Sequence, residues 1–347
     1  MKVIVDNKIP YIKEAIEKIA DEVVYLPGKD FTPEAVKDAD ALIIRTRTHC
    51  NKELLEGSSV KFIATATIGF DHIDTEYCKE AGIMWTNAPG CNSGSVAQYL
   101  HSTLLLLEIE KGLDLKNACI GIVGVGNVGK KIAEVAKSLG MKVLLNDPPR
   151  ADKEGKKGFV DLDTIARECD VITFHTPLNR EGIYKTFHLA NQKFFSSLKK
   201  KPFIINTSRG EVIDTEAIGK ALQNGEIRDA VIDVWENEPN INLELLNRIF
   251  IGTPHIAGYS ADGKANATRM SLEALCSFFK IKKKFTITPP SPTQTIHTDT
   301  IEEAFLQMYD PRNDCNALRK HPESFEQLRG DYPLRREMEA YFIIPVL

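Results

Sequence analysis

The sequence predicts an α/β protein built on parallel sheets, and three observations lead to this fold class. Short apolar runs rich in β-branched residues alternate with helical segments over about the first 280 of 347 residues. Such alternation is typical of strand–helix–strand crossovers, which produce parallel sheets. Runs that are apolar on both faces, such as Cys119–Gly124, suit strands covered by helices on both sides. Because two such series can be separated, we expect two doubly wound, Rossmann-like domains with a cleft between them.

The strands and helices of the two series can be placed approximately. Helical segments are expected at Asn127–Leu139 and Thr215–Gln223, and two longer helices at about 94–111 and 260–281. The predicted strands, in chain order, are Val3–Val5, Ala41–Ile44, Phe62–Thr65, Ile120–Val123, Val143–Leu145, Val171–Phe174, Phe203–Asn206 and Val231–Val234.

The two long helices are natural crossings between the domains and set their boundaries. Residues 1–92 and 260–284 would form the substrate-binding domain, and residues 93–259 an inserted nucleotide-binding domain. Three closely spaced prolines then predict a linker over Phe285–His297, because proline cannot continue a helix. The remaining residues are few for an independent core, so we expect this tail to pack on its own body or on a second subunit.

The composition argues against several classes of protein. The chain has 44 Lys and Arg against 48 Asp and Glu, a net charge of −4, so no overall positive field would recruit nucleic acid or a membrane surface. No apolar stretch has the length of a membrane span, and the first residues read as a buried strand, not as a signal peptide. Seven scattered cysteines and eight unclustered histidines indicate reduced thiols in the cytoplasm and no metal site. The basic run Lys280–Lys284 is interpreted as a solvated helix end.

A glycine-rich turn, GVGNVG at Gly124–Gly129, follows one predicted strand and opens a helix. Glycines there permit a tight turn and a close approach of the backbone to a pyrophosphate, and the helix N-terminus attracts the phosphates. About 20 residues further on, Asp147 ends the next strand, where a carboxylate can accept hydrogen bonds from both ribose hydroxyls. We therefore predict NAD as the cofactor, not NADP, although Arg150 nearby could favour NADP. The alternative is a turn in which the glycines serve packing only.

Three further peptides carry residues suited to oxidising a 2-hydroxy acid, each after a predicted strand. Arg209 offers a two-pronged cation for a carboxylate, and His255 is a natural acid–base at neutral pH. Glu238 can orient the histidine ring. We expect His255 to take the proton of the 2-hydroxyl while a hydride leaves carbon 2. Taken singly, Arg209 could cap a helix and His255 could be a structural residue.

The order of these motifs resembles the D-isomer-specific 2-hydroxyacid dehydrogenase family. The peptides that carry the resemblance cover about residues 1–335 and include VDNKIPY, DADALIIRTRT, KFIATATIGFDHID, APGCN, GIVGVGNVGKK, NDPPRAD, FHTPL and GTPHIAGYSADGKA. The resemblance implies that Arg209, Glu238 and His255 are the active-site residues, and that Thr46, Thr67 and Tyr259 contact substrate. It implies that the following residues contact NAD: Gly124, Gly126, Asn127, Val128, Gly129, Asp147, Thr176, Thr207, Ser208, Arg209, Asp233 and Gly258. It also implies a small α+β dimerisation domain over 285–347 and thus a homodimer.

The implied substrate is a small phosphorylated 2-hydroxy acid, and a phosphate needs a cationic pocket. Arg45 and Arg47 end a predicted strand, and either could bind the phosphate, although both could equally form surface ion pairs. Two other functions stay open. The chain could be another dehydrogenase of this family, such as a phosphoglycerate dehydrogenase, or a non-catalytic NAD-sensing protein resembling the corepressors that share this fold.

Overall fold

The computed structural model describes residues 1–344, which divide into two compact units. Unit 1 comprises Met1–Asn92 and Ser260–Ser291, and unit 2 comprises Ser93–Tyr259 and the chain from Pro292 onward. Both units are built on parallel sheets, which confirms the predicted fold class. No helix within residues 1–344 is both long and apolar enough to cross a membrane.

The sheet of unit 1 has five parallel strands in the order β2-β1-β3-β4-β5. Their bounds are Lys2–Asp6 (β1), Glu22–Leu26 (β2), Ala41–Ile44 (β3), Phe62–Thr65 (β4) and Met84–Thr86 (β5). The central strands β3 and β4 are buried along their whole length, as their uninterrupted apolar sequences require. The sequence analysis missed β2 and β5, which lie at the two edges and are only partly buried.

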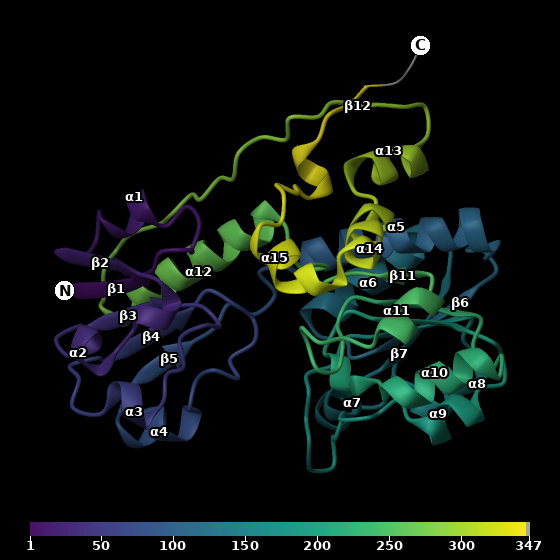
Figure 1. Ribbon diagram of the computed structural model, residues 1–347, viewed down its shortest axis with the longest axis horizontal. Helices are drawn as coiled ribbons and strands as arrows, with labels where there is room; N and C mark the ends of the chain where they lie inside the picture. The colour runs from purple at the N-terminus through teal and green to yellow at the C-terminus, as the bar shows by residue number, and fades with distance from the viewer. Residues whose placement is uncertain (345–347) are drawn as a thin grey trace. The chain divides into compact units, whose positions relative to one another are not determined.

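Helices cover both faces of this sheet (Figure 1). Apolar side chains of α2, α3 and α4 pack on one face, and those of α1 and α12 pack on the other. The long helix α12 begins after Ser260, whose hydroxyl accepts the Gly263 N–H at 2.8 Å. The bounds are Lys13–Ile16 (α1), Pro33–Val36 (α2), Lys52–Leu55 (α3), Thr75–Glu80 (α4) and Ala261–Phe278 (α12).

The sheet of unit 2 has six parallel strands in the order β11-β10-β9-β8-β6-β7. Five of them correspond to predicted strands, whereas β11 has two residues and was not predicted. The bounds are Cys119–Val123 (β6), Lys142–Asn146 (β7), Val171–Phe174 (β8), Phe203–Asn206 (β9), Asp229–Ile232 (β10) and Ile251–Gly252 (β11). The strand order reverses at β6, since β7 is added on one side of β6 and β8 on the other. In such sheets ligands bind at this point, outside the carboxyl ends of the strands.

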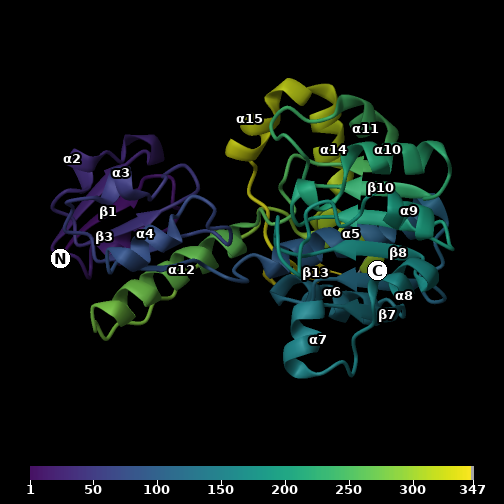
Figure 2. The ribbon, with the colours of Figure 1, turned by 90° about the horizontal axis from the view of Figure 1, so that it is seen from below.

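The helices of unit 2 form two layers around this sheet (Figures 1 and 2). Apolar residues of α5 and α6 share one core with the sheet, and those of α8 to α11 share the other. The bounds are Ser93–Lys111 (α5), Asn127–Ser138 (α6), Pro148–Glu154 (α7), Leu162–Glu168 (α8), Gln192–Ser197 (α9), Thr215–Gln223 (α10) and Leu243–Arg248 (α11).

Most of these helices start at a side chain that satisfies the free N–H groups of the first turn. Asp161, Asn191, Asp214 and Asn242 each accept a backbone N–H at the start of α8, α9, α10 and α11 respectively. Such a cap contributes about 1 kcal/mol. Helix α6 differs, because its N-cap residue is Gly126, which has no side chain to bond the free N–H groups.

The C-terminal segment, expected to be a small domain over 285–347, packs on the two larger units. Residues 285–291 group with unit 1, and the chain from Pro292 groups with unit 2. The physical reason is that its apolar residues enter existing cores: Phe305 and Tyr309 join the core of α5 and α6, whereas Leu318 and Phe325 join the other. Both views place α14 and α15 side by side (Figures 1 and 2). The bounds are Ile296–His297 (β12), Ile301–Met308 (α13), Pro311–Lys320 (α14), Phe325–Gly330 (α15) and Ile343–Ile344 (β13), and β12 pairs with β13 in parallel.

Candidate active site

The sheet of unit 2 brings most of the predicted nucleotide-binding residues to one edge. All its strands are parallel, so the loops that follow them start at the same edge. Gly124 follows β6, Asp147 follows β7, Thr176 follows β8, Thr207 follows β9 and Asp233 follows β10. This edge includes the point between β6 and β8 where the strand order reverses.

The three glycines of the turn have three different surroundings. Gly124 has a φ of +90°, and a Cβ there would lie 2.6 Å from the carbonyl oxygen of His175. A Cβ on Gly129 would lie 2.1 Å from the carbonyl oxygen of Gly124, so the helix can pack this closely only without a side chain. A Cβ on Gly126 would meet nothing within 4 Å. Two glycines are therefore needed for the turn itself, and the third leaves open space beside the helix start.

The polar groups around this turn fit a dinucleotide. Helix α6 offers N–H groups that no side chain caps, and Asn127 beside them is exposed. The hydroxyl of Thr176 is buried and has no hydrogen-bond partner within residues 1–344. A phosphate at the helix start is a favourable acceptor for such N–H groups. The residues present thus match the chemistry of a pyrophosphate-containing cofactor.

Asp147 is bonded directly to the glycine turn. Its Oδ2 accepts the Val125 N–H at 2.8 Å, and its Oδ1 accepts the Arg150 N–H at 3.1 Å as the N-cap of α7. Each carboxylate oxygen keeps further acceptor capacity, which ribose hydroxyls could use. The Arg150 guanidinium donates to the Val125 carbonyl oxygen at 2.6 Å and pairs with Glu154 at 2.6 Å. Its charge is therefore already paired, which weakens the case for NADP.

Asp147→Asn is expected to raise the KM for NAD about ten-fold and to reduce discrimination against NADP. A charged hydrogen bond is lost, worth roughly 1.5–3 kcal/mol, and so is the repulsion of a 2′-phosphate. Asparagine keeps a capping oxygen, so the fold should persist. Steady-state kinetics with both cofactors measure the change. Asp161→Asn is the matched control, since Asp161 caps α8 in the same way. Unaltered cofactor preference in Asp147→Asn would remove Asp147 from the cofactor site.

The residues after β8 and β9 form a small polar cluster. His175 Nε2 lies 2.8 Å from the Thr173 hydroxyl, and its Nδ1 lies 3.2 Å from the Thr207 hydroxyl. Burial lowers the pKa of His175 to about 3, so the ring stays neutral. The Ser208 hydroxyl donates to Asn206 Oδ1 at 2.8 Å and is buried. Thr207 and Ser208 thus lie at the predicted edge, where a neutral histidine and an asparagine hold them.

His255 and Glu238 form a hydrogen-bonded pair. Nδ1 of His255 lies 2.8 Å from Glu238 Oε2 and 3.1 Å from Oε1. Glu238 Oε1 also accepts the Trp235 N–H at 2.9 Å. Burial tends to raise the pKa of Glu238, but the bond and charge of His255, the Trp235 N–H and the Arg329 charge outweigh it and lower this pKa. Glu238 is therefore ionised at neutral pH, and it leaves Nε2 of His255 to exchange a proton.

The loop that carries His255 is fixed by Asp233. His255 has a φ of +57°, and its N–H donates to the Asp233 carbonyl oxygen at 2.7 Å. The Asp233 carboxylate, 1% exposed, accepts the N–H groups of Ile256 at 2.8 Å and Ala257 at 3.0 Å, as well as the Thr253 hydroxyl at 2.6 Å. This carboxylate thus shapes the histidine loop, and its expected contact with NAD stays a prediction. Gly258 and Tyr259 follow in the same loop and are half-buried.

Arg209 lies in the turn after β9 and is held by its own neighbours. Its Nη1 donates to the Ser208 carbonyl oxygen at 2.8 Å, and its carbonyl oxygen accepts from Asn206 at 2.9 Å. Within residues 1–344 its guanidinium has no carboxylate partner, and its side chain is half-buried. A Cβ on Gly210 would lie 2.0 Å from the Trp235 carbonyl carbon, so the arginine turn packs directly on the turn that leads to Glu238. Such a cation is suited to binding a carboxylate.

The remaining predicted substrate residues lie in unit 1, at the carboxyl ends of the neighbouring strands β3 and β4. Thr46 and Arg47 are exposed. Arg45 is half-buried, donates to the Lys8 carbonyl oxygen at 3.1 Å and lies 3.8 Å from the buried Asp6 carboxylate. The Thr67 hydroxyl lies 2.7 Å from that of Thr65 and 2.9 Å from the Gly69 carbonyl oxygen. Unit 1 therefore presents two hydroxyls and two cations at one sheet edge.

The sequence analysis missed two arginines of the C-terminal segment. Arg329 lies 3.8 Å from Glu238 Oε2, and Arg335 donates to the carbonyl oxygens of Ile256 and Ala257 in the histidine loop. No motif marks either residue, because they belong to an ordinary polar stretch far along the chain. Only the packing of this segment on unit 2 reveals their place.

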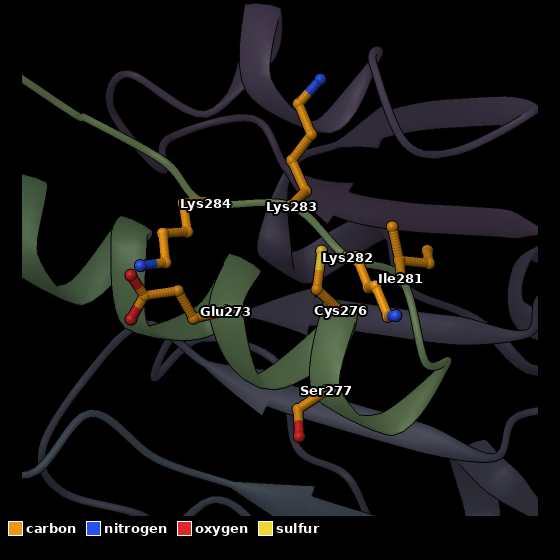
Figure 3. A pocket seen from close by; sticks show the side chains of 7 residues that line it. All are labelled: Glu273, Cys276, Ser277, Ile281, Lys282, Lys283 and Lys284. Carbon is orange, nitrogen blue, oxygen red and sulfur yellow. The ribbon is translucent and has the colours of Figure 1, made fainter.

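The last three lysines of the basic run, Lys282, Lys283 and Lys284, line a hollow of about 460 Å³ on unit 1 (Figure 3). Besides the lysines, its lining contains Glu273, Cys276 and Ser277 of α12 and Ile281 just beyond the helix. Arg209, Glu238 and His255 all belong to unit 2. The hollow therefore contains none of the three groups that the oxidation of a 2-hydroxy acid requires.

Comparison with known proteins identifies close relatives. Residues 106–257 match the NAD binding domain of D-isomer specific 2-hydroxyacid dehydrogenases, and residues 283–345 match a domain of unknown function. The chain is 68% identical to an erythronate-4-phosphate dehydrogenase of Bacteroides fragilis, over 99% of both chains. It is 66% identical to the one from Bacteroides thetaiotaomicron, over the whole of both. Among solved structures, an NAD⁺-bound 3-phosphoglycerate dehydrogenase of Entamoeba histolytica is 29% identical, with a TM-score of 0.68 over 82% of this chain and 98% of the other.

Proposed function

The chain belongs to the erythronate-4-phosphate dehydrogenases, within the D-isomer-specific 2-hydroxyacid dehydrogenase family, and on this premise we propose its reaction. It oxidises 4-phospho-D-erythronate at carbon 2 to 2-oxo-3-hydroxy-4-phosphobutanoate with NAD, a step of pyridoxal 5′-phosphate (vitamin B6) biosynthesis. The observation that carries this proposal is the identity of 68% over almost the full length of both chains. The competing phosphoglycerate dehydrogenase is supported by only 29% identity to a solved structure of that activity.

The residues of unit 2 account for the chemistry of the oxidation. NAD, when bound, supplies the acceptor for the hydride that leaves carbon 2. Nε2 of His255 takes the proton of the 2-hydroxyl, and the ionised Glu238 at 2.8 Å stabilises the positive ring that results. Arg209 binds the substrate carboxylate through its two-pronged guanidinium and polarises the forming carbonyl. In the reverse direction His255 returns the proton.

Arg45 and Arg47 of unit 1 are proposed to bind the 4-phosphate. They flank the exposed Thr46 at the end of β3, and Thr67 follows the adjacent strand. Asp6, 3.8 Å from Arg45, partly compensates the charge of that arginine. Guanidinium groups suit phosphate because they match its oxygens in pairs.

A panel of acids tests the reaction and the phosphate site together. The assay follows reduced nicotinamide absorbance in a single turnover, so that an enzyme that retains NADH is not scored as inactive. We expect the highest rate with 4-phospho-D-erythronate, and far lower rates with D-erythronate, 3-phospho-D-glycerate and D-lactate. Arg45→Glu or Arg47→Glu should remove the preference for the phosphorylated acid. Preference for another acid would refute the proposed substrate, and unaltered turnover in both variants would refute the phosphate site.

A homodimer formed through the C-terminal segment is also proposed. This segment exposes an unusual set of large apolar side chains for so short a stretch: Ile301, Leu334, Met338, Phe342 and Ile343. Phe342 is 84% exposed, so Phe342→Ser should shift the sedimentation coefficient from dimer towards monomer without unfolding the chain. We place the protein in the cytoplasm, where its seven buried free thiols would stay reduced.

A further inference from the structure

One arginine of the C-terminal segment contacts the carboxylate that orients the catalytic histidine. Nη1 of Arg329, in α15, lies 3.8 Å from Glu238 Oε2 and 3.3 Å from Glu326 Oε1. The side chains of Arg329 and Glu238 are 22% and 18% exposed, so water screens their interaction only in part. The guanidinium also lies over the rings of Tyr259 and Phe325, 5.9 Å and 5.8 Å from their centres. Arg329 is therefore held in place by aromatic rings on one hand and carboxylates on the other.

A second arginine fixes the same segment to the histidine loop. Arg335 is 4% exposed and donates to the carbonyl oxygens of Ala257 at 2.6 Å and Ile256 at 3.4 Å. Asp233 accepts the N–H groups of these same two residues. The loop after His255 is thus bound through its N–H groups by Asp233, which follows β10, and through its carbonyl oxygens by Arg335 of the C-terminal segment. The position of Arg329 beside Glu238 is consequently part of the folded unit and not a chance surface contact.

We propose that Arg329 is a positioning residue of the active site, which shares the Glu238 carboxylate with His255 and thereby sets the pH at which His255 accepts the substrate proton. This inference rests on the proposed function, because it assigns His255 as the base. It also gives the C-terminal segment a part in catalysis besides its proposed role in dimerisation.

The direction of the effect follows from the charges around the pair. Glu238 attracts a proton to His255, and the buried Asp233 adds to that attraction. The positive charge of Arg329 opposes this attraction, because it lies beside the Glu238 carboxylate and partly compensates its negative charge. Glu326 in turn partly compensates the charge of Arg329, and the Tyr259 hydroxyl interacts with Arg329 as well. Arg329 therefore makes the electrostatic potential at the His255 ring less negative than Glu238 and Asp233 alone would make it.

The test measures the acid limb of the kcat/KM profile for the 2-hydroxy acid in the full-length enzyme. Arg329→Gln should move its midpoint up by about 0.5–1 pH unit, since one nearby cation is lost. Arg329→Lys keeps the charge and should restore most of the midpoint. Glu326→Gln should move the midpoint in the opposite direction by a smaller amount, because Arg329 is then less compensated. The KM at high pH should change less than two-fold in each.

Arg319→Gln is the matched control. Arg319 lies in the same segment and donates to the carbonyl oxygens of Leu246 and Phe250, but it does not contact Glu238. Its replacement can lower the melting temperature and should leave the midpoint in place. An unmoved midpoint in Arg329→Gln would overturn the proposal, and so would a raised KM with an unmoved midpoint, which would make Arg329 a substrate-binding residue.

A second measurement keeps this inference separate from the proposed function. The ring of His255 can be titrated by NMR in NAD-loaded, histidine-labelled protein, with the signal assigned by its loss in His255→Asn. If the wild-type enzyme fails to oxidise the phosphorylated acid, the proposed function fails. The ring titration still decides the role of Arg329, since an unchanged midpoint in Arg329→Gln and Glu326→Gln overturns it. Should Arg329→Gln not fold, Arg329→Lys and Glu326→Gln suffice.

Discussion

His255→Asn is expected to lower kcat by about 10³-fold while NAD still binds. Asparagine cannot accept the hydroxyl proton, so water must replace the base. It tolerates the positive φ of +57° at this position, and the loop held by Asp233 should therefore keep its shape. Pre-steady-state and steady-state rates, together with NAD binding followed by fluorescence, measure the two effects separately.

Two further variants show whether the loss comes from the proton transfer. Glu238→Gln should cost less, about 10–100-fold, because the ring keeps a hydrogen-bond partner but loses a negative charge. His321→Asn is the matched control, since His321 is an exposed histidine of the C-terminal segment. A His255→Asn enzyme with nearly normal kcat would show that another group is the base. Loss of NAD binding in it would point to a damaged fold.

The sequence could predict those parts of the structure whose physical cause lies in a short stretch of neighbouring residues. Gly124 is required by its positive φ, and both Gly124 and Gly129 by backbone contacts that leave no room for a side chain. The spacing of the glycines therefore predicts the turn. The buried strands β3, β4, β8 and β9 are continuous apolar runs and were found where the structure has them. Of the partly exposed edge strands, β2 and β5 were missed, whereas β7 was found.

Other features depend on contacts between distant parts of the chain. The bonds of Asp233 to the histidine loop could not be predicted, because its burial and its contacts with Ile256 and Ala257 appear only in three dimensions. The C-terminal segment was expected to be too small for a core of its own. Its composition could not predict which two cores its apolar residues would join. Arg329 acts on Glu238 across about 90 residues of sequence, a distance at which no periodicity or spacing rule applies.

The geometry of Arg209 leads to the second large effect: Arg209→Lys is expected to lower kcat/KM for the 2-hydroxy acid about 100-fold, and Arg209→Gln about 10³-fold. A lysine keeps the charge but loses the two-pronged match to a carboxylate. It also loses the bond from Nη1 to the Ser208 carbonyl oxygen that fixes the side chain. Glutamine removes the charge as well. Because the guanidinium has no carboxylate partner within residues 1–344, its replacement leaves no unpaired acid behind, and the melting temperature should change little.

The cofactor and substrate roles of Arg209 can be told apart at saturating NAD. If Arg209 binds the substrate carboxylate, the loss in kcat/KM for the acid persists there, and the NAD dissociation constant changes only a few-fold. If the loss disappears at saturating NAD, Arg209 serves the cofactor instead, and the carboxylate must be bound elsewhere. Arg248→Lys provides the matched control, because Arg248 is a surface arginine paired with Glu244 in α11 and should tolerate lysine without any effect on rate.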